Sequence, residues 1–153
     1  MEKVGFVKLL EEVGSEDQPV AGGKGANLGE MIKAGLPVPE GFVLLVDSYR
    51  EFVEANGLEK HIEKLLASLA EGTNDSSDHV VGGEGAQGLK ETTDEIKSLF
   101  ARGKIPQKVK EDIDRAYETL GHPVVAVRSS ATAEDLPGAS FAGQYSTYLN
   151  IKG

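Results

Sequence analysis

A glycine-rich segment near the N-terminus has residue types that bind phosphate. Residues 22–29 read GGKGANLG, four glycines around one lysine, Lys24. Glycines let backbone N–H groups approach an anion, and the N-terminus of a following helix adds partial positive charge. The Lys24 ammonium can add a point charge on a phosphate oxygen. Because the spacing fits neither the Walker A nor the dinucleotide pattern, a plain turn with a solvated lysine remains the alternative interpretation.

A second candidate segment begins at Arg128, directly after the apolar run 123–127. The run predicts a buried strand, and ligands commonly bind where such strands end. Arginine there offers a forked donor for phosphate. The small and polar residues that follow include Ser129, Ser130, Thr132, Gly138, Ser140, Gly143 and Gln144. The two glycines bracket a tip that could fold over a ligand. The alternative is an exposed hairpin in which Arg128 pairs with Glu134 or Asp135.

Other possible sites are weaker. Residues 83–88 (GEGAQG) match the dinucleotide glycine pattern. Only a short apolar stretch precedes them, and two predicted helices follow before the next strand, so a linker is the favoured interpretation. His61, His79 and His122 lie far apart without ligand spacing, and we predict no metal site. The absence of cysteine excludes disulfides, thiolate metal sites and a cysteine nucleophile.

The composition narrows the class of protein. The 153 residues include 16 Lys and Arg against 25 Asp and Glu, a formal net charge of −9. That charge argues against nucleic acid or an anionic membrane surface as partner. No apolar run reaches the ~18 residues of a membrane span, and the start does not resemble a signal peptide. We therefore expect an acidic cytoplasmic domain. Its unusual feature is the 19 glycines, well above the ordinary share.

The N-terminal half is predicted to alternate short strands and helices around the first candidate segment. The strands are 6–10 and 42–46, and the helices are 26–34, 48–55 and 58–69. Gly35 stands where a left-handed residue ends a helix, and Pro37 prevents its continuation. Ser48 with Glu51 forms a capping-box pattern that opens the next helix.

The C-terminal half is predicted to contain two helices and then two strands. Thr92 with Glu95 forms a capping box for the first helix, and Pro106 suits the first turn of the second. The apolar stripe of the second helix is Val109, Ile113, Ala116, Tyr117 and Leu120. After the strand 123–127, residues 144–151 alternate with the period of a strand. The order of elements predicts an α+β, loosely mixed α/β, fold.

A polar segment interrupts this pattern. Residues 71–88 are rich in Gly, Ser, Asp and Asn, which is typical of a linker. We expect one domain over residues 1–153, with sub-parts 1–70 and 89–153 joined by this linker.

The two candidate segments together resemble a known family. GGKGANLGEM with GLPVPEGF, followed by VAVRSSATAEDLPGASFAGQYSTYLNI, is similar to the N-terminal nucleotide-binding region of phosphoenolpyruvate synthase (pyruvate, water dikinase). The same region occurs in pyruvate phosphate dikinase and rifampicin phosphotransferase. Two long motifs in order are more specific than either glycine pattern alone. The resemblance runs from about Gly5 to Gly153, apart from the linker, and the wording RSSATAEDLP favours the synthase and rifampicin branches.

The resemblance implies the N-terminal lobe of an ATP-grasp fold, in which two lobes hold ATP between them. Such an enzyme uses ATP and Mg²⁺ to phosphorylate a histidine on a separate domain. A further domain then passes phosphate to pyruvate, giving phosphoenolpyruvate, AMP and phosphate. The implied partners are ATP, the remaining lobe, the phosphohistidine domain and the pyruvate domain. Lys24 and Arg128 become the catalytic residues that hold the ATP phosphates. The implied ATP-binding set is Gly23, Lys24, Gly25, Arg128, Ser129, Thr132, Gly138, Gly143 and Gln144, and the magnesium ligands are expected downstream of this chain.

We therefore expect an ATP-binding N-terminal part of a phosphoenolpyruvate synthase-like dikinase that is inactive alone, because half of the nucleotide site is missing. The loop from Thr132 to Gln144 would be the mobile cover that excludes water. Two alternatives remain open. One is an ATP lobe of the rifampicin phosphotransferase type, and the other is a short non-catalytic protein that binds a nucleotide or a partner.

Overall fold

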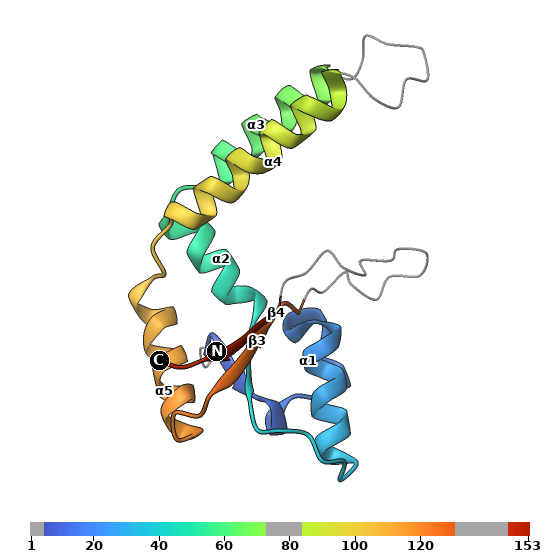
Figure 1. The fold of residues 1–153 in the computed structure, drawn as a ribbon, viewed down its shortest axis with the longest axis vertical. Helices are drawn as coiled ribbons and strands as arrows, with labels where there is room; N and C mark the ends of the chain where they lie inside the picture. The colour runs from blue at the N-terminus through green and yellow to red at the C-terminus, as the bar shows by residue number, and fades with distance from the viewer. Residues whose placement is uncertain (1–4, 73–83, 131–146) are drawn as a thin grey trace. The chain divides into compact units, whose positions relative to one another are not determined.

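The computed structural model describes residues 5–72, 84–130 and 147–153 (Figure 1). Its strands are β1 (Val7–Leu9), β2 (Phe42–Leu44), β3 (Val125–Arg128) and β4 (Thr147–Ile151). Its α-helices are α1 (Gln18–Lys33), α2 (Val46–Ala55), α3 (Glu59–Gly72), α4 (Glu84–Arg102) and α5 (Gln107–Thr119), and two 3-10 turns, η1 (Leu10–Glu12) and η2 (Ser15–Asp17), precede α1. Helices thus combine with small sheets, and the predicted α+β class is confirmed.

The chain divides into two compact units. One comprises Met1–Tyr49 and Gln107–Gly153, and the other comprises Arg50–Pro106. The helices α3 and α4, which flank the polar segment, pack against each other in the second unit. These compact units therefore differ from the sub-parts expected on either side of the linker, and the single domain over residues 1–153 stays a prediction.

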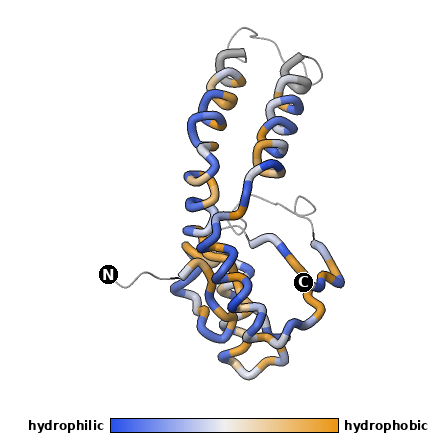
Figure 2. The backbone as a smooth tube through the Cα atoms, turned by 90° about the vertical axis from the view of Figure 1, so that its left-hand side faces the viewer, coloured by the Kyte–Doolittle hydropathy of each residue, from blue (hydrophilic) through white to orange (hydrophobic). Residues whose placement is uncertain are grey.

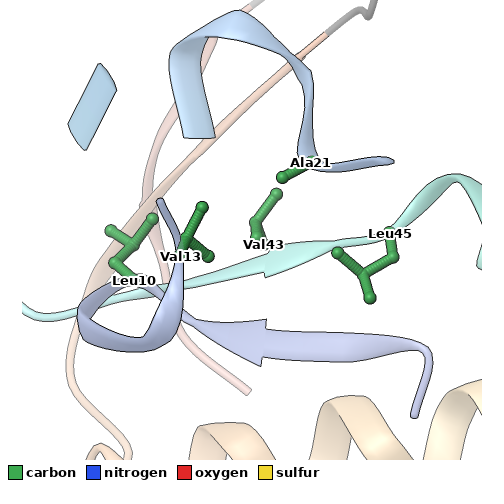
Figure 3. Close-up of a cluster of buried hydrophobic side chains, with 5 residues drawn as sticks. All are labelled: Leu10, Val13, Ala21, Val43 and Leu45. Carbon is green, nitrogen blue, oxygen red and sulfur yellow. The ribbon is translucent and has the colours of Figure 1, made fainter. Parts of the chain in front are cut away.

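The first unit has its core between a two-stranded sheet and α1. Strands β1 and β2 pair antiparallel, with Val7 opposite Leu44 and Leu9 opposite Phe42. The core side chains come from η1, the segment after it, α1 and the β2 region: Leu10, Val13, Ala21, Val43 and Leu45 (Figure 3). Burial of these apolar side chains supplies the main force that holds α1 on the sheet. The core therefore fixes α1 at Ala21, directly before the glycine-rich segment.

Helix α1 begins earlier than the sequence pattern predicts. It starts at Gln18, with Pro19 in its first turn, and runs through the glycines to Lys33. Gly22 alone departs from helical geometry, with φ 75° and ψ 163°, so the helix has a kink at this residue. The predicted glycine turn before a helix is confirmed at Gly22, but the helical piece after it begins at Gly23 and not at residue 26, so the remaining glycines of the segment are helical.

The C-terminal end of α1 agrees with the prediction. Gly35 has φ 76°, in the left-handed region. The Gly35 N–H donates to the Ile32 carbonyl at 2.9 Å, and the Leu36 N–H donates to the Met31 carbonyl at 3.0 Å. These two bonds form a Schellman motif, which satisfies the last carbonyls of the helix.

Both predicted capping boxes are wrong. Helix α2 begins at Val46, so Ser48 lies inside its first turn and donates its hydroxyl to the Leu45 carbonyl at 2.6 Å. Thr92 lies in the interior of α4, which begins at Glu84. In both places the helix begins before the predicted capping residue, at Val46 and at Glu84.

The polar segment is partly helical. Residues 71 and 72 complete α3, and residues 84–88 form the first turns of α4. The predicted linker 71–88 is therefore too long at both ends. Most of the dinucleotide-like GEGAQG sequence is α-helical, so it does not form the strand-to-helix turn that a dinucleotide site needs.

The second unit is built around the α3–α4 pair, which runs side by side in Figure 1. Apolar and polar residues alternate along both helices in Figure 2, as expected of amphipathic helices. At the base of the pair, the Phe52 and Phe100 rings stack with centroids 5.6 Å apart. The Asn56 side chain accepts from the Lys104 N–H at 2.8 Å and donates to the Lys104 carbonyl at 3.0 Å. Aromatic packing and this paired hydrogen bond close the base of the unit.

Strands β3 and β4 form a second antiparallel pair, with Arg128 opposite Thr147. The strand predicted over residues 144–151 is confirmed for Thr147–Ile151, whose residues are all exposed. Gln144, Tyr145 and Ser146 lie outside the described residues. The strand predicted at 123–127 is confirmed by β3, but its predicted burial is wrong, since Val124 is 59% exposed and Val127 is 49% exposed. Within the described residues the pair forms a sheet of only two strands, which leaves apolar side chains at the surface.

Helix α5 carries the apolar stripe that the sequence predicts. Val109 and Ala116 are buried, and the helix packs on β1. Its Asp112 carboxylate accepts the Phe6 N–H at 2.8 Å, directly before β1. This bond satisfies a backbone donor at the edge of the sheet.

Candidate functional site

The kink of α1 contacts the end of β3 through one side chain. The Ser130 hydroxyl donates to the Ala21 carbonyl at 2.8 Å and accepts the Gly25 N–H at 3.3 Å. More than one hundred residues separate Ser130 from both partners in the sequence. The two candidate segments, residues 22–29 and the segment beginning at Arg128, are therefore adjacent in the fold.

The backbone of Ser130 also packs directly on Gly22. A Cβ atom added to Gly22 would lie 2.9 Å from the Ser130 carbonyl oxygen and 3.0 Å from its carbon. The positive φ of Gly22 adds a second reason for glycine, because side chains other than glycine strain in that conformation. Glycine at this position thus permits both the bend and the close approach.

Two other glycines of the segment are explained by packing. A Cβ atom on Gly25 would lie 3.2 Å from the Val43 Cγ2 atom of β2. A Cβ atom on Gly29 would overlap the Val13 carbonyl oxygen. These glycines let the α1 backbone approach the sheet and the segment after η1. The predicted role of Gly25 in ATP binding stays a prediction.

The predicted phosphate ligands lie near this contact. Gly23 is buried and Lys24 is half-buried, in the first turn after the kink. Arg128 is exposed at the last position of β3, and the half-buried Ser129 connects it to Ser130. The structure thus brings an ammonium-bearing turn and a guanidinium-bearing strand end to one region. This is a combination that suits an anion.

The rest of the predicted set lies outside the described residues. This applies to Thr132, Gly138, Gly143 and Gln144, to the cover from Thr132 to Gln144, and to the alternative Arg128 partners Glu134 and Asp135. The roles proposed for these residues stay predictions.

An ion pair holds the start of α1. The Lys8 ammonium of β1 lies 2.8 Å from the Asp17 carboxylate, which also accepts the Gly14 N–H at 3.0 Å. The hydrogen bond from Lys8, and then that from Gly14, lower the pKa of Asp17 below its usual value. Both favour the charged carboxylate. The pair therefore ties η2, immediately before α1, to the sheet.

A separate groove of about 170 Å³ lies between η1, the region after α1 and the end of α5. Its lining includes apolar Leu10, Ile32 and Leu120 together with the carboxylates Glu11 and Glu40. None of the predicted phosphate ligands lines it. Because its charged groups are acidic, it does not suit a polyphosphate.

Residues 5–72, 84–130 and 147–153 contain neither a candidate metal cluster nor a candidate membrane-spanning helix. No group of three or more His, Cys, Asp or Glu side chains in these ranges could hold a metal ion. No helix in the same ranges combines the length and apolar character needed to cross a bilayer. His122, at the turn before β3, places its ring edge-on to Tyr117 with centroids 4.9 Å apart, which is a packing contact.

Serine 130 is the residue whose importance the sequence did not indicate. It was one of several hydroxyl side chains after Arg128 that could offer hydrogen bonds, and nothing local distinguished it. The informative signal is a pair of features far apart in the chain, a glycine that bends a helix and a serine that reaches the bend.

Comparison with known proteins matches residues 18–153 to a family described as pyruvate phosphate dikinase, AMP/ATP-binding domain. The chain is 43% identical over 154 residues to a protein named probable phosphoenolpyruvate synthase of Methanocaldococcus jannaschii, covering 97% of this chain and 12% of that protein. It is also 43% identical over 154 residues to the phosphoenolpyruvate synthase of Aeropyrum pernix, and 43% identical over 158 residues to that of Aquifex aeolicus. Each of these two alignments covers 97% of this chain and 17% of the relative.

The chain thus spans 12–17% of the length of these curated relatives. The family match includes both candidate segments and nearly the whole described structure. On this match, the chain belongs to the family of pyruvate phosphate dikinase AMP/ATP-binding domains.

Proposed function

We propose that the chain is the ATP-binding N-terminal lobe of a phosphoenolpyruvate synthase-like dikinase, with the first lobe of an ATP-grasp architecture. The observation that carries the proposal is the Ser130 contact, because it joins the Lys24 turn to the end of the strand that holds Arg128. Family membership supports a nucleotide as the ligand. The names of the relatives favour pyruvate over an antibiotic as the final acceptor.

The proposed chemistry is positioning and charge neutralisation. Phosphoryl transfer requires mainly that the phosphates be held in place and their negative charge be stabilised. Lys24 supplies a point charge and Arg128 a forked donor. Gly23 lies at the start of the helical segment after the kink, where backbone N–H groups and the helix dipole favour an anion. Gly25, Ser129, Thr132, Gly138, Gly143 and Gln144 complete the proposed ATP-binding set.

The remaining parts of the proposed reaction lie on other domains. The phosphorylated histidine and the pyruvate site are proposed partners of this lobe, and the complete enzyme is proposed to be cytoplasmic. ATP chemistry of this kind uses Mg²⁺, but no acidic, histidine or cysteine group among the described residues fits a metal site. We therefore assign none of these residues to the metal.

Titration of the 153-residue chain with Mg-ATP, followed by the NMR shifts of its amides, tests the proposal. We expect the shifts to concentrate in residues 22–29 and 128–144. Changing Arg128 to Ala should weaken ATP binding by about 1.5–3 kcal/mol, because a charged hydrogen bond is lost. Arg102→Ala is the matched control, since it removes an exposed arginine at the end of α4 in the other compact unit.

Two outcomes would contradict this proposal. One is a set of ATP-dependent shifts confined to residues 84–88. The other is an equal loss of affinity in the Arg128→Ala and Arg102→Ala variants, which would indicate a general charge effect. We also expect no ATP hydrolysis above background by the chain alone, because one lobe provides only half of an ATP-grasp site.

A further inference from the structure

The Ser130 hydroxyl occupies a particular place in α1. In an uninterrupted α-helix, each N–H donates to the carbonyl four residues earlier. The N–H of Gly25 would therefore donate to the carbonyl of Ala21. Instead, Ser130 Oγ accepts from Gly25 at 3.3 Å and donates to Ala21 at 2.8 Å. One hydroxyl thus bridges the Ala21 carbonyl, which ends the helical piece before Gly22, and the Gly25 N–H in the first turn of the piece after it.

This insertion spans the kink, where the bend itself is made by the nonhelical φ and ψ of Gly22. A side chain that enters the ladder is a recognised cause of helix bending. The nonhelical residue, Gly22, lies between Ala21 and Gly25. A hydroxyl can donate one bond and accept others at the same time, which both halves of the broken rung require. The small serine side chain fits because Gly22 has no Cβ to meet the Ser130 backbone.

The insertion also links two charged side chains. Lys24 lies between the kink and Gly25, while Arg128 lies two residues before Ser130 at the end of β3. If the rung closed directly, the turn that carries Lys24 would change its direction relative to the strand end. The Ser130 contact therefore joins the backbone of the turn that carries Lys24 to the backbone that follows Arg128 at the strand end.

We propose that Ser130 is a positioning residue of the ATP-phosphate site, which holds α1 bent so that Lys24 and Arg128 face the same phosphates. This inference rests on the proposed function of those two side chains. Ser130 acts through Gly25 and Ala21, because its hydroxyl accepts the Gly25 N–H and donates to the Ala21 carbonyl. Its contribution to ATP affinity is geometric.

Three variants of the 153-residue chain test this inference. Ser130→Ala removes the hydroxyl, and Ser130→Thr retains one. Ser68→Ala is the matched control, because Ser68 donates its hydroxyl to the Lys64 carbonyl at 2.9 Å on a different helix, α3. The measurements are Mg-ATP affinity and hydrogen exchange of the Gly25 amide, with circular dichroism to verify the fold.

We expect Ser130→Ala to lower ATP affinity roughly tenfold, the size of one lost hydrogen bond, and to alter Gly25 exchange. Ser130→Thr should stay within about threefold of the wild-type affinity, and Ser68→Ala should leave it unchanged. Rescue by threonine separates the role of the hydroxyl from simple loss of packing. If the alanine variant does not fold, the threonine variant decides the question. Retained Mg-ATP affinity in the threonine variant supports the inference, and a tenfold loss of that affinity overturns the inference.

The failure of this inference differs from the failure of the proposed function. A wild-type chain that binds no Mg-ATP contradicts the proposed function, and the positioning role is lost with it. A wild-type chain that binds Mg-ATP, together with an alanine variant that binds equally tightly despite altered Gly25 exchange, overturns the positioning role alone.

Discussion

The two glycine-rich segments of the chain, 22–29 and 82–88, contain four glycines each but have different structural roles. In the first, a Cβ atom would meet the Ser130 backbone at Gly22, a Val43 side chain at Gly25 and the Val13 carbonyl at Gly29. In the second, the described glycines lie in the first turns of α4. A Cβ atom on Gly88 would meet only Leu69 at 3.9 Å, an ordinary contact.

This difference shows why the letters of a glycine pattern are a poor guide to chemistry. The second segment matches a dinucleotide pattern by sequence, yet residues 84–88 continue into an amphipathic helix. The first segment matches no standard nucleotide pattern, but its backbone is bent and approached by a distant strand end. Close approach of other groups to the backbone, which glycine allows, distinguishes the two segments.

The largest expected effect is at Gly22. Gly22→Ala adds a Cβ atom 2.9 Å from the Ser130 carbonyl oxygen and places alanine in a conformation almost restricted to glycine. Backbone strain and overpacking together predict a loss of about 3–4 kcal/mol in the free energy of unfolding. Urea-induced unfolding of the chain measures this loss.

Gly35→Ala is the matched control for that variant. Gly35 also has a positive φ, 76°, but a Cβ atom there would meet nothing within 4 Å. It should lose only about 1 kcal/mol, the cost of the left-handed conformation. Equal losses at the two glycines would contradict the close approach of Ser130 to the kink.

A smaller effect is expected at the ion pair that precedes the first segment. Asp17→Asn removes the charge that Lys8 and the Gly14 N–H stabilise, and should lower stability by about 1–2 kcal/mol at pH 7. Because the folded pKa of Asp17 is lowered, this contribution is fully present above the ordinary value of 3.8. It is lost as the pH falls below that value through the lowered pKa.

Unfolding measured at pH 7 and near pH 2 tests this dependence. The difference between wild type and Asp17→Asn should shrink at the lower pH. Glu63→Gln is the control, because Glu63 is exposed on α3 in the second unit. A difference between wild type and Asp17→Asn that is unchanged between the two pH values would show that charge on Asp17 does not stabilise this region.

Local features of the fold were predictable from the sequence because local chemistry determines them. The left-handed Gly35, the positions of the strands β1 and β2 and the buried side of α5 each follow from a few neighbouring residues. The starts of α2 and α4 were not predictable from capping residues alone. Ser48 donates to the preceding Leu45 carbonyl, and Thr92 lies within a helix that already began at Glu84.

The geometry of the candidate site depends on contacts that sequence spacing does not show. Lys24 and Arg128 were identified by residue type, but the two segments that carry them meet through Ser130, which bonds to Ala21 and Gly25 more than one hundred residues away in the chain. The exposure of β3 also depends on tertiary packing and not on local sequence. An apolar run becomes buried only where another layer of the fold covers it. Tertiary partners decided both outcomes.

The smallest expected effect is at Gly88, in the second segment. Gly88→Ala should stabilise the chain by about 0.5–1 kcal/mol, because alanine is the better helix former and its Cβ atom has room beside Leu69. Urea-induced unfolding again measures the change, and Mg-ATP affinity should remain unchanged. Since Gly22→Ala is expected to destabilise, opposite signs for the same substitution would separate a glycine required by close approach from one placed in an ordinary helix. A destabilising Gly88→Ala variant would instead indicate that the second segment has a close neighbour of its own.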